Sequence, residues 1–284
     1  MSVNTKFTDG FAQSAWYLLI IATSIVLLSF ILFPMYFLVV SSLQPPDQLF
    51  SSSPNVLPFP ASSHFYKIAT EEAPILLWSW NSLLVVFGTI ALTMPLAVLA
   101  AYAIARLSFP GRILASRMFL LLYMFPSVLL LVPLFVLLAQ LGLVNTRFGL
   151  VVAHSTFALP FSIWYLTAYI RTIPKDTEDA ALVDGCNRLR MLWSVLIPIM
   201  LPGIAATAAF VFMFSWNEYA FAITVVQTAD LRTLPLGVTS YFSAQGIPWG
   251  VVLATAVLMT IPVALIVMVA QRYFIGGLTA GSIK

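Results

Sequence analysis

Six long stretches without a charged residue dominate this chain of 284 residues. They run from Gly10 to Pro46, Ala73 to Ala105, Met118 to Thr146, Phe148 to Ile170, Met191 to Asn217 and Thr233 to Gln271. An α-helix needs roughly 20 apolar residues to span the hydrocarbon core of a bilayer, so each stretch is long enough to cross it. Only 8% of the residues are charged, which is too few for a water-soluble surface. The sequence therefore predicts an all-α polytopic membrane protein.

The six stretches predict six transmembrane helices within a single transmembrane domain over residues 1–284. The helices are expected at residues 15–43, 77–106, 112–140, 148–171, 201–226 and 249–273. Extracytoplasmic loops are expected at 44–76 and 227–248, a cytoplasmic loop at 172–200 and a cytoplasmic tail at 274–284.

Basic residues predict the orientation. With a cytoplasmic N-terminus, ten of the 13 Lys and Arg residues fall in cytoplasmic segments, and only Lys67, Arg147 and Arg232 fall outside. Basic residues concentrate on the cytoplasmic side of membrane proteins. We therefore expect a multi-pass protein of a bacterial inner membrane with both termini in the cytoplasm. The first apolar stretch is too long for the core of a signal peptide, so we expect it to be retained.

Catalytic and metal-binding patterns are missing from the sequence. Cys186 is the only cysteine, and His64 and His154 lie ninety residues apart without a nearby carboxylate pattern. The sequence contains no Gly-x-x-x-x-Gly-Lys-Ser/Thr motif, which cradles the phosphates of ATP in many ATPases. We expect a non-enzymatic chain that holds neither a cofactor nor a metal.

A polar island between Pro174 and Pro202 interrupts the apolar pattern. Its acidic start, with Asp176 as the expected N-cap, favours a helix N-terminus, and Gly185 is expected to end that helix. At helical spacing, one face carries Thr177, Ala180, Ala181 and Asp184. Because alanines keep this face thin, it is suited to enter a groove on another protein. An ordinary amphipathic surface helix would carry the same end signals.

The end of the island predicts a second helix. It is expected from about Asn187 to Ile197, with Pro198 and Pro202 marking the change of direction into the next membrane segment.

Several motifs together resemble one transporter family. The segment Asp179-Ala180-Ala181-Leu182-Val183-Asp184-Gly185, followed ten residues on by Val195-Leu196-Ile197-Pro198, resembles the cytoplasmic coupling loop of binding-protein-dependent ABC import permeases. With Ala103-Ile104-Ala105-Arg106-Leu107-Ser108-Phe109-Pro110-Gly111, Trp216-Asn217-Glu218 and the tail Gly277-Leu278-Thr279-Ala280-Gly281-Ser282, nearly the whole chain resembles the maltose-type carbohydrate permeases. The tail makes it similar to the second permease of the pair. Asp179, Val195 and Ile197 depart from the family pattern but preserve its charge and shape.

The resemblance implies a type I ABC importer permease fold and a set of partners. These are a second permease subunit, two copies of an ABC ATPase that hold ATP and Mg²⁺, and an extracytoplasmic solute-binding protein, with no nucleic acid. The resemblance implies that the ATPase is contacted by Glu178, Asp179, Ala180, Ala181, Asp184, Gly185, Val195, Ile197 and Pro198. It also implies that the tail from Gly277 to Ser282 reaches between the ATPase subunits.

Polar residues near the outer side are candidates for solute contact. An ionisable group such as Glu218 within a membrane segment usually faces a bundle interior, a cavity or an interface. The candidates for the translocation path are Asn81, Trp216, Asn217, Glu218 and Tyr219. Glu218 can instead pair with a neighbouring subunit or reach the headgroups. The candidates for contact with the binding protein are Tyr241, Phe242, Ser243 and Gln245, although any hydrated loop carries such residues.

The expected function is therefore import of a carbohydrate, such as maltose, trehalose or a glucosyl-polyol, driven by ATP hydrolysis on separate subunits. The alternatives are an ABC importer for another polar solute or an ion-coupled secondary carrier. Such a carrier would be expected to show an internal repeat or several intramembrane charges, and the sequence shows neither. An intramembrane enzyme would need a paired nucleophile and base, which the sequence also lacks.

Overall fold

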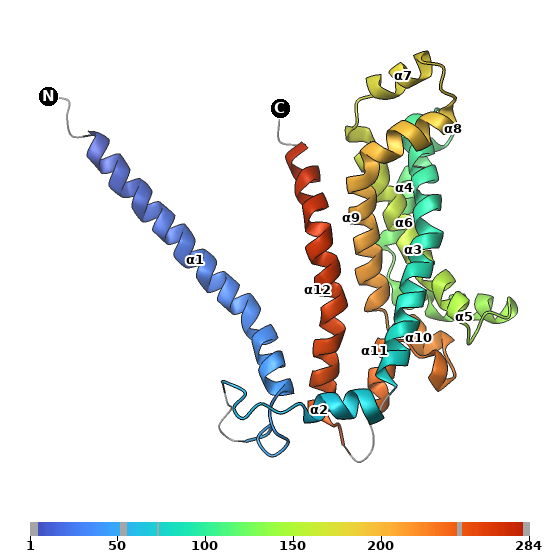
Figure 1. Ribbon diagram of the computed structural model, residues 1–284. Coiled ribbons are helices and arrows are strands. Elements are labelled where there is room, and N and C mark those ends of the chain that lie inside the picture. The colour runs from blue at the N-terminus through green and yellow to red at the C-terminus, as the bar shows by residue number, and fades with distance from the viewer. Residues whose placement is uncertain (1–4, 52–55, 73, 243–245, 281–284) are drawn as a thin grey trace. The chain divides into compact units, whose positions relative to one another are not determined.

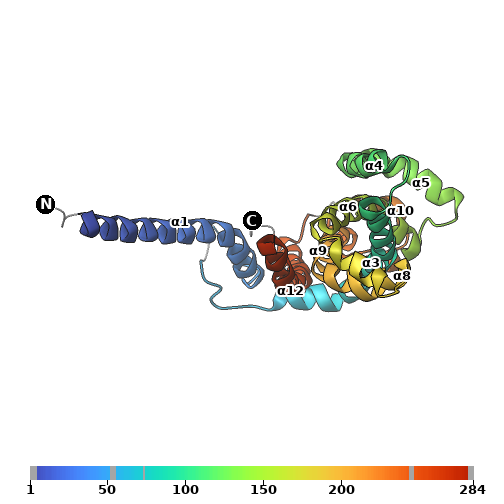
Figure 2. The ribbon, with the colours of Figure 1, turned by 90° about the horizontal axis from the view of Figure 1, so that it is seen from above.

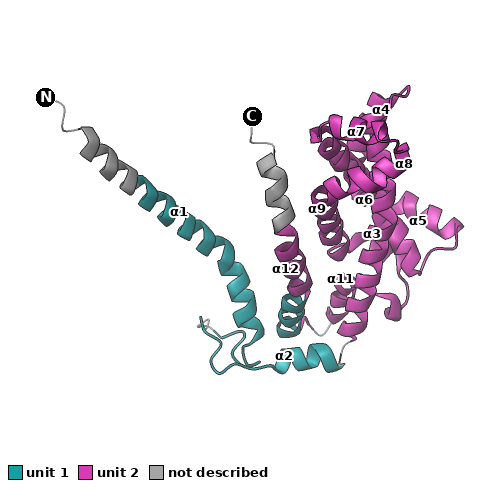
Figure 3. Ribbon diagram, turned by 45° about the horizontal axis from the view of Figure 1, so that its top comes forward, with its two compact units in different colours: residues 1–73, 248–258 teal, residues 74–247, 259–284 magenta. Residues whose placement is uncertain are grey.

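The computed structural model describes residues 5–51, 56–72, 74–242 and 246–280, with side chains described except at 5–15, 72 and 272–280. Helices make up its architecture, and the longest connection between them runs from Ser42 to His64 (Figure 1). The chain divides into two compact units: residues 1–73 with 248–258, and residues 74–247 with 259–284 (Figure 3). The single transmembrane domain expected from the sequence stays a prediction.

The first unit contains α1 (Thr5–Ser42), α2 (His64–Lys67), the π-helix η1 (Ile68–Glu72) and the start of α12 (Trp249–Ala280). The Ser42 hydroxyl lies 2.7 Å from that of Tyr66, which holds the end of α1 against α2. On α12, Gly250 lies directly against the ring of Phe65, since a Cβ at this glycine would lie 2.2 Å from a ring atom. These contacts order the segment around α2.

The core of the second unit consists of α3 (Ile75–Arg106), α6 (Arg147–Thr172) and α9 (Ile197–Trp216), which run side by side (Figures 1 and 2). Of the most apolar part of α6, 72% is buried, against 39% for α3 and 44% for α9, so α6 is the central helix. Glycines allow close approach: a Cβ at Gly88 of α3 would lie 2.7 Å from Val151 of α6.

The expected third helix, 112–140, is broken. It consists of α4 (Arg112–Met124), the 3₁₀ turn η2 (Ser127–Leu130) and α5 (Leu131–Gln140), with a bend of 95°. The cause is Pro126, which lacks a backbone N–H and forces Phe125 into an extended conformation with ψ 132°. Within the described residues, five helices are long and apolar enough to cross a membrane, or six if this bent pair counts as one span.

The fifth expected helix, 201–226, is also interrupted. α9 ends at Trp216, and a separate short helix, α10 (Ala220–Val225), begins after residues 217–219. The expected helices 77–106 and 148–171 correspond to α3 and α6, whereas α1 begins earlier and α12 ends later than expected.

The bundle of the second unit has two ends that matter for function. The "α7 end" holds α7 (Asp176–Val183), α8 (Arg188–Met191) and the C-termini of α3 and α6, and the "α11 end" holds η4 (Ala229–Leu231), α11 (Leu234–Val238) and η5 (Thr239–Tyr241) (Figure 1). At 1.5 Å per residue, the 32 residues of α3 span about 48 Å between these ends.

Candidate functional site

The short helix α7 occupies the polar island expected to dock on a partner. Acidic residues fill its first turn, and the N–H groups of Glu178 and Asp179 both bond to the Lys175 carbonyl, at 2.8 and 3.0 Å. Asp176 was expected to be the N-cap, but the structure places it inside the first turn with Lys175 as the N-cap. The acidic residues thus act on the helix dipole rather than through a side-chain cap.

A tight turn ends α7 at Gly185, as the sequence suggested. Gly185 adopts a φ of +86°, which costs glycine little because it lacks a Cβ. Its N–H bonds to the Leu182 carbonyl and that of Cys186 to the Ala181 carbonyl, both at 3.1 Å. This pair of bonds is the Schellman motif, and it turns the chain sharply towards α8.

Two buried residues form the inner face of α7. Glu178 is 6% exposed and Ala181 is 8% exposed, and they are the buried residues of this helix. Ala180 and Ala181 were expected to share the docking face, but the structure turns Ala181 into the apolar core and leaves Ala180 exposed. At helical spacing, the exposed residues Asp176, Asp179, Ala180 and Val183 form the outward face, and the exposed Asp184 and Gly185 follow the helix.

Arg106, the last residue of α3, binds the inner face of α7. Its Nε donates to the Glu178 carboxylate at 2.5 Å, and its Nη2 donates to the Ile173 carbonyl at 2.7 Å. Both charged side chains are nearly buried, at 7% and 8% exposure. Sequence reasoning missed this pair. The sequence feature that could have indicated it is the single arginine at the end of a long uncharged stretch.

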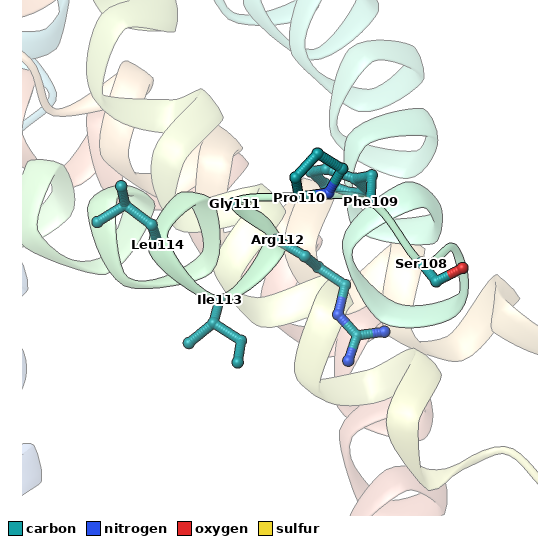
Figure 4. A pocket seen from close by; sticks show the side chains of 7 residues that line it. All are labelled: Ser108, Phe109, Pro110, Gly111, Arg112, Ile113 and Leu114. Atoms are coloured by element: carbon teal, nitrogen blue, oxygen red, sulfur yellow. The ribbon is translucent and has the colours of Figure 1, made fainter.

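A polar cleft of about 190 Å³ adjoins this ion pair. It is lined by Tyr102, Arg106, Leu107, Lys175, Glu178, Asp179, Leu182, Arg188 and Met191. A larger concavity of about 530 Å³ follows the turn from Ser108 to Leu114, where Arg112 and Ile113 project to the same side (Figure 4). Both concavities lie near the C-terminal end of α3, and the first directly adjoins α7.

The chain is helical again from Arg188. The Asn187 side chain caps α8 by accepting the Arg190 N–H at 2.8 Å. α8 then continues through the π-helix η3 (Leu192–Leu196) into α9, so the helix does not break at Pro198 or Pro202, but the chain changes direction between α8 and α9 (Figure 1). Of the candidate coupling residues here, Val195 and Ile197 pack against the apolar core beside α7. Pro198 is exposed in the first turn of α9.

At the α11 end, the Glu218 carboxylate is bound by groups of its own chain. Its carboxylate accepts the N–H groups of Phe221 at 2.9 Å and Ala222 at 3.3 Å, which caps α10. It also lies 3.3 Å from Nε2 of the fully buried His154, whose Nδ1 is 2.7 Å from the Ser215 hydroxyl. The structure thus brings together a histidine and a carboxylate that no sequence pattern connects.

The Asn81 side chain also forms hydrogen bonds within its own chain. Its amide nitrogen donates to the carbonyls of Asp230 at 2.7 Å and Arg232 at 2.9 Å, and its oxygen accepts Arg147 Nε at 2.9 Å. The side chain is fully buried and ties these segments together. Nearby, a hydrogen bond from Thr228 holds the pKa of the exposed Asp230 below its ordinary value.

The remaining solute candidates differ in exposure. Trp216 is 1% exposed, and its indole N–H donates to the Met259 carbonyl at 3.2 Å, so it is a core residue. Asn217 is exposed and donates to the Met213 carbonyl, and Tyr219 is 37% exposed. Of the five candidates, Asn217 and Tyr219 are exposed, Glu218 is half-buried, and Asn81 and Trp216 are buried in this conformation.

The candidate partner contacts are described only in part. Tyr241 is half-buried with its ring 6.1 Å from that of Trp78, and Phe242 is 50% exposed. Ser243 and Gln245 lie outside the described residues, as do Gly281 and Ser282 and the side chains of Gly277, Leu278, Thr279 and Ala280. Across the described part of the chain, no group of three His, Cys, Asp or Glu residues is arranged to hold a metal.

Comparison with known proteins gives the family. Residues 74–279 match the family described as binding-protein-dependent transport system inner membrane component. The chain is 34% identical over 93% of its length to a sulfoquinovosyl glycerol transport system permease protein of Agrobacterium fabrum, covering 92% of that protein. It is 33% identical over 94% of its length to a trehalose/maltose transport system permease protein of Thermococcus litoralis, covering 96% of it.

Solved structures show the same fold. A chain of a bacterial ABC transporter involved in alginate import aligns with a TM-score of 0.75 at 19% identity, covering 96% of this chain and 99% of that one. A chain of the MetNI methionine ABC transporter aligns with a TM-score of 0.54 at 19% identity, over 72% and 94% of the two chains. The chain therefore belongs to the family of inner membrane components of binding-protein-dependent transport systems.

Proposed function

We propose that this chain is one of two permease subunits of an ATP-driven importer for a glycoside, such as a disaccharide, an oligosaccharide or a glycosylated polyol. The family itself supplies the membrane component of an importer that depends on a binding protein. The relatives named for sulfoquinovosyl glycerol, for trehalose and maltose, and for diacetylchitobiose support the substrate class, since all these solutes carry sugar rings.

The proposed complex contains a second permease, two ABC ATPase subunits and an extracytoplasmic solute-binding protein. ATP and Mg²⁺ would bind to the ATPase subunits, and the two permeases would each form half of the translocation path. The excess of basic residues in the segments around α7 supports a cytoplasmic α7 end and cytoplasmic termini. The tail from Gly277 to Ser282 would lie at the ATPase interface.

The observation that carries the proposal is the two-faced character of α7. One face is fixed to the bundle through Glu178 and Ala181, and the other presents Asp179, Ala180 and Val183, which are exposed among the described residues. A helix held on one side and open on the other transmits force from a partner to the bundle. The small Ala180 lets a partner's backbone approach α7 closely.

The mechanism then follows as linkage between two sites. ATP binding closes the ATPase pair and moves α7, and the attached helices shift between inward and outward access. Such coupling requires that the ATPase–α7 contact differ in free energy between the two states. The alternative within the same class is a different polar solute, because the fold does not determine specificity.

The test is solute-stimulated ATP hydrolysis by the complex co-expressed with its genomic neighbours and reconstituted in lipid. Disaccharides, glycosylated polyols and amino acids are each offered with the binding protein. Stimulation by a glycoside supports the proposal and identifies the substrate, whereas stimulation by an amino acid alone overturns the substrate class. An assembled complex whose transport follows an ion gradient and shows no ATPase activity overturns the importer mechanism.

A further inference from the structure

The helix α7 is attached to its bundle by few groups. Of its eight residues, Glu178 and Ala181 are buried, and Ala181 offers only a methyl group. The ion pair with Arg106 is thus the polar contact that fixes the position of α7 relative to α3. Both charges are nearly buried, so the pair is little screened by solvent, and loss of one partner leaves a buried charge.

Arg106 joins three elements at one point. The guanidinium belongs to the end of α3, bonds the carboxylate of Glu178 on α7, and bonds the carbonyl of Ile173, which ends α6. A planar guanidinium holds two acceptors in fixed directions, which a lysine ammonium cannot do. Any displacement of α7 therefore acts directly on the end of α3.

Hydrogen bonds and one close contact also fix the opposite end of α3. Trp78, Asn81 and Ser82 are spaced i, i+3 and i+4 and so lie on one face of the helix. Asn81 binds two carbonyls of the segment 229–241, and the Ser82 hydroxyl accepts the Leu234 N–H at 2.8 Å. Trp78 packs against Gly237, where a Cβ would lie 2.2 Å from the indole.

One continuous helix thus connects the two ends. α3 is described without interruption over about 48 Å, with the ion pair at one end and the segment 229–241 at the other. Rigid helices that end in hydrogen-bonded contacts are physical carriers of coupling between distant sites.

We propose that Arg106 is a positioning residue that makes α3 follow α7, so that motion of the docking helix reaches the segment 229–241 beside the candidate binding-protein contacts. The inference rests on the proposed role of α7 in docking the ATPase. It adds a specific mechanical route, α7–Arg106–α3–Asn81, through which a loaded binding protein stimulates ATP hydrolysis.

The test compares Arg106→Gln with a matched control in the reconstituted complex. The control is Arg171→Gln, because Arg171 lies at the same end, is exposed and forms no ion pair within the described residues. The readout is the ratio of ATPase activity with the sugar-loaded binding protein to activity without it. Arg106→Gln is expected to lower this ratio about fivefold or more, since coupling free energies correspond to factors of this size, while the control keeps it.

Exchanging the charges of Arg106 and Glu178 distinguishes an effect on the position of α7 from an effect on stability. Glu178→Arg alone is expected to lower the ratio, and the double variant Arg106→Glu with Glu178→Arg is expected to regain at least half of the loss. An assembled Arg106→Gln complex with the wild-type ratio overturns the proposal. A double variant that assembles but is no better coupled than either single variant also overturns it.

The other end of α3 provides an independent measurement if the Arg106 variants do not assemble. Ser82→Ala removes one hydrogen bond far from α7 and is expected to lower the same ratio without changing the amount of ATPase bound. A wild-type ratio in this variant overturns the proposal. Absence of stimulation in the wild-type complex would instead overturn the proposed function, so the two failures are distinguishable.

Discussion

The carboxylate of Glu218 lies 3.3 Å from Nε2 of His154 and accepts the backbone N–H groups that begin α10. One side chain thereby fixes the break between α9 and α10 and joins it to the central helix α6. Glu218, a candidate for the translocation path, thus also stabilises the local fold. A break held in this way keeps the exposed Asn217 and Tyr219 in a defined position at the α11 end.

Glu218→Ala should destabilise the permease by about 0.5–2 kcal/mol, the usual cost of losing a helix cap. It also removes the carboxylate that lies 3.3 Å from His154 Nε2, an atom without a hydrogen bond among the described residues. Glu218→Gln should cost less, because its amide oxygen still accepts a backbone N–H. The measurement is the Tm of the purified complex in detergent, with Asn217→Ala as the control. Equal Tm values for wild type and Glu218→Ala would contradict the capping role.

The sequence predicted the helices α3 and α6 well because charged residues flank their apolar stretches. Arg106 ends the first and Arg147 begins the second, and charge is expensive inside a bilayer. The bend at Pro126 was not predictable in the same way, because Pro95 and Pro160 stay inside α3 and α6. Proline alone does not say whether neighbouring packing will keep a helix continuous.

Candidate site residues were harder to place from sequence for a physical reason. Arg106 and Glu178 are 72 residues apart, and no local period connects them. Asn81 bonds backbone carbonyls 149 and 151 residues away, and a carbonyl group has no sequence signature. Ala180 and Ala181 lie about 100° apart around α7, so one faces outward while the other enters the core.

Ala180→Asp should impair docking of the ATPase without impairing folding. Ala180 is exposed, so the substitution should change the free energy of unfolding by only about 0.5 kcal/mol or less, yet place a charge in the proposed ATPase contact. Transport is expected to fall about tenfold or more at an unchanged Tm. Ala181→Asp, by contrast, buries a carboxylate in the core and should also lower the Tm. Wild-type transport by an assembled Ala180→Asp complex would show that α7 is not the docking helix.

Gly185→Val should loosen the end of α7, whereas Gly185→Asn should be tolerated. At a φ of +86° a β-branched residue is strained by about 1–2 kcal/mol, and asparagine adopts this region more readily. A Cβ at Gly185 would meet nothing within 4 Å, so the effect comes from the backbone alone. Hydrogen exchange of the α7 amides measures it. Equal protection in the two variants would show that the turn does not depend on this conformation.

Asp230 should contribute to stability at neutral pH and lose that contribution only in acid. The hydrogen bond from Thr228 lowers the folded-state pKa below the ordinary 3.8, so the contribution is complete above that value and disappears as the pH falls through the lower folded-state pKa. The Tm difference between wild type and Asp230→Asn should therefore be constant from about pH 5 to pH 8. A difference that shrinks between pH 7 and pH 5 would contradict the direction of the shift.

Gly237→Ala should disturb the outer attachment of α3 through Trp78. The new Cβ would lie 2.2 Å from the indole, so the ring or α11 must move, and overpacking of this kind costs about 1–3 kcal/mol. Because Trp78 also contacts Tyr241, the displacement should lower the stimulation of ATPase activity by the binding protein as well as the Tm.

Trp78→Leu in the same chain should relieve the collision, so the double variant should be more stable than the sum of the single effects predicts. The expected coupling is about 0.5–3 kcal/mol, as found for residues in contact. Additive effects of Gly237→Ala and Trp78→Leu would show that the close approach of α11 to α3 does not hold the segment 229–241.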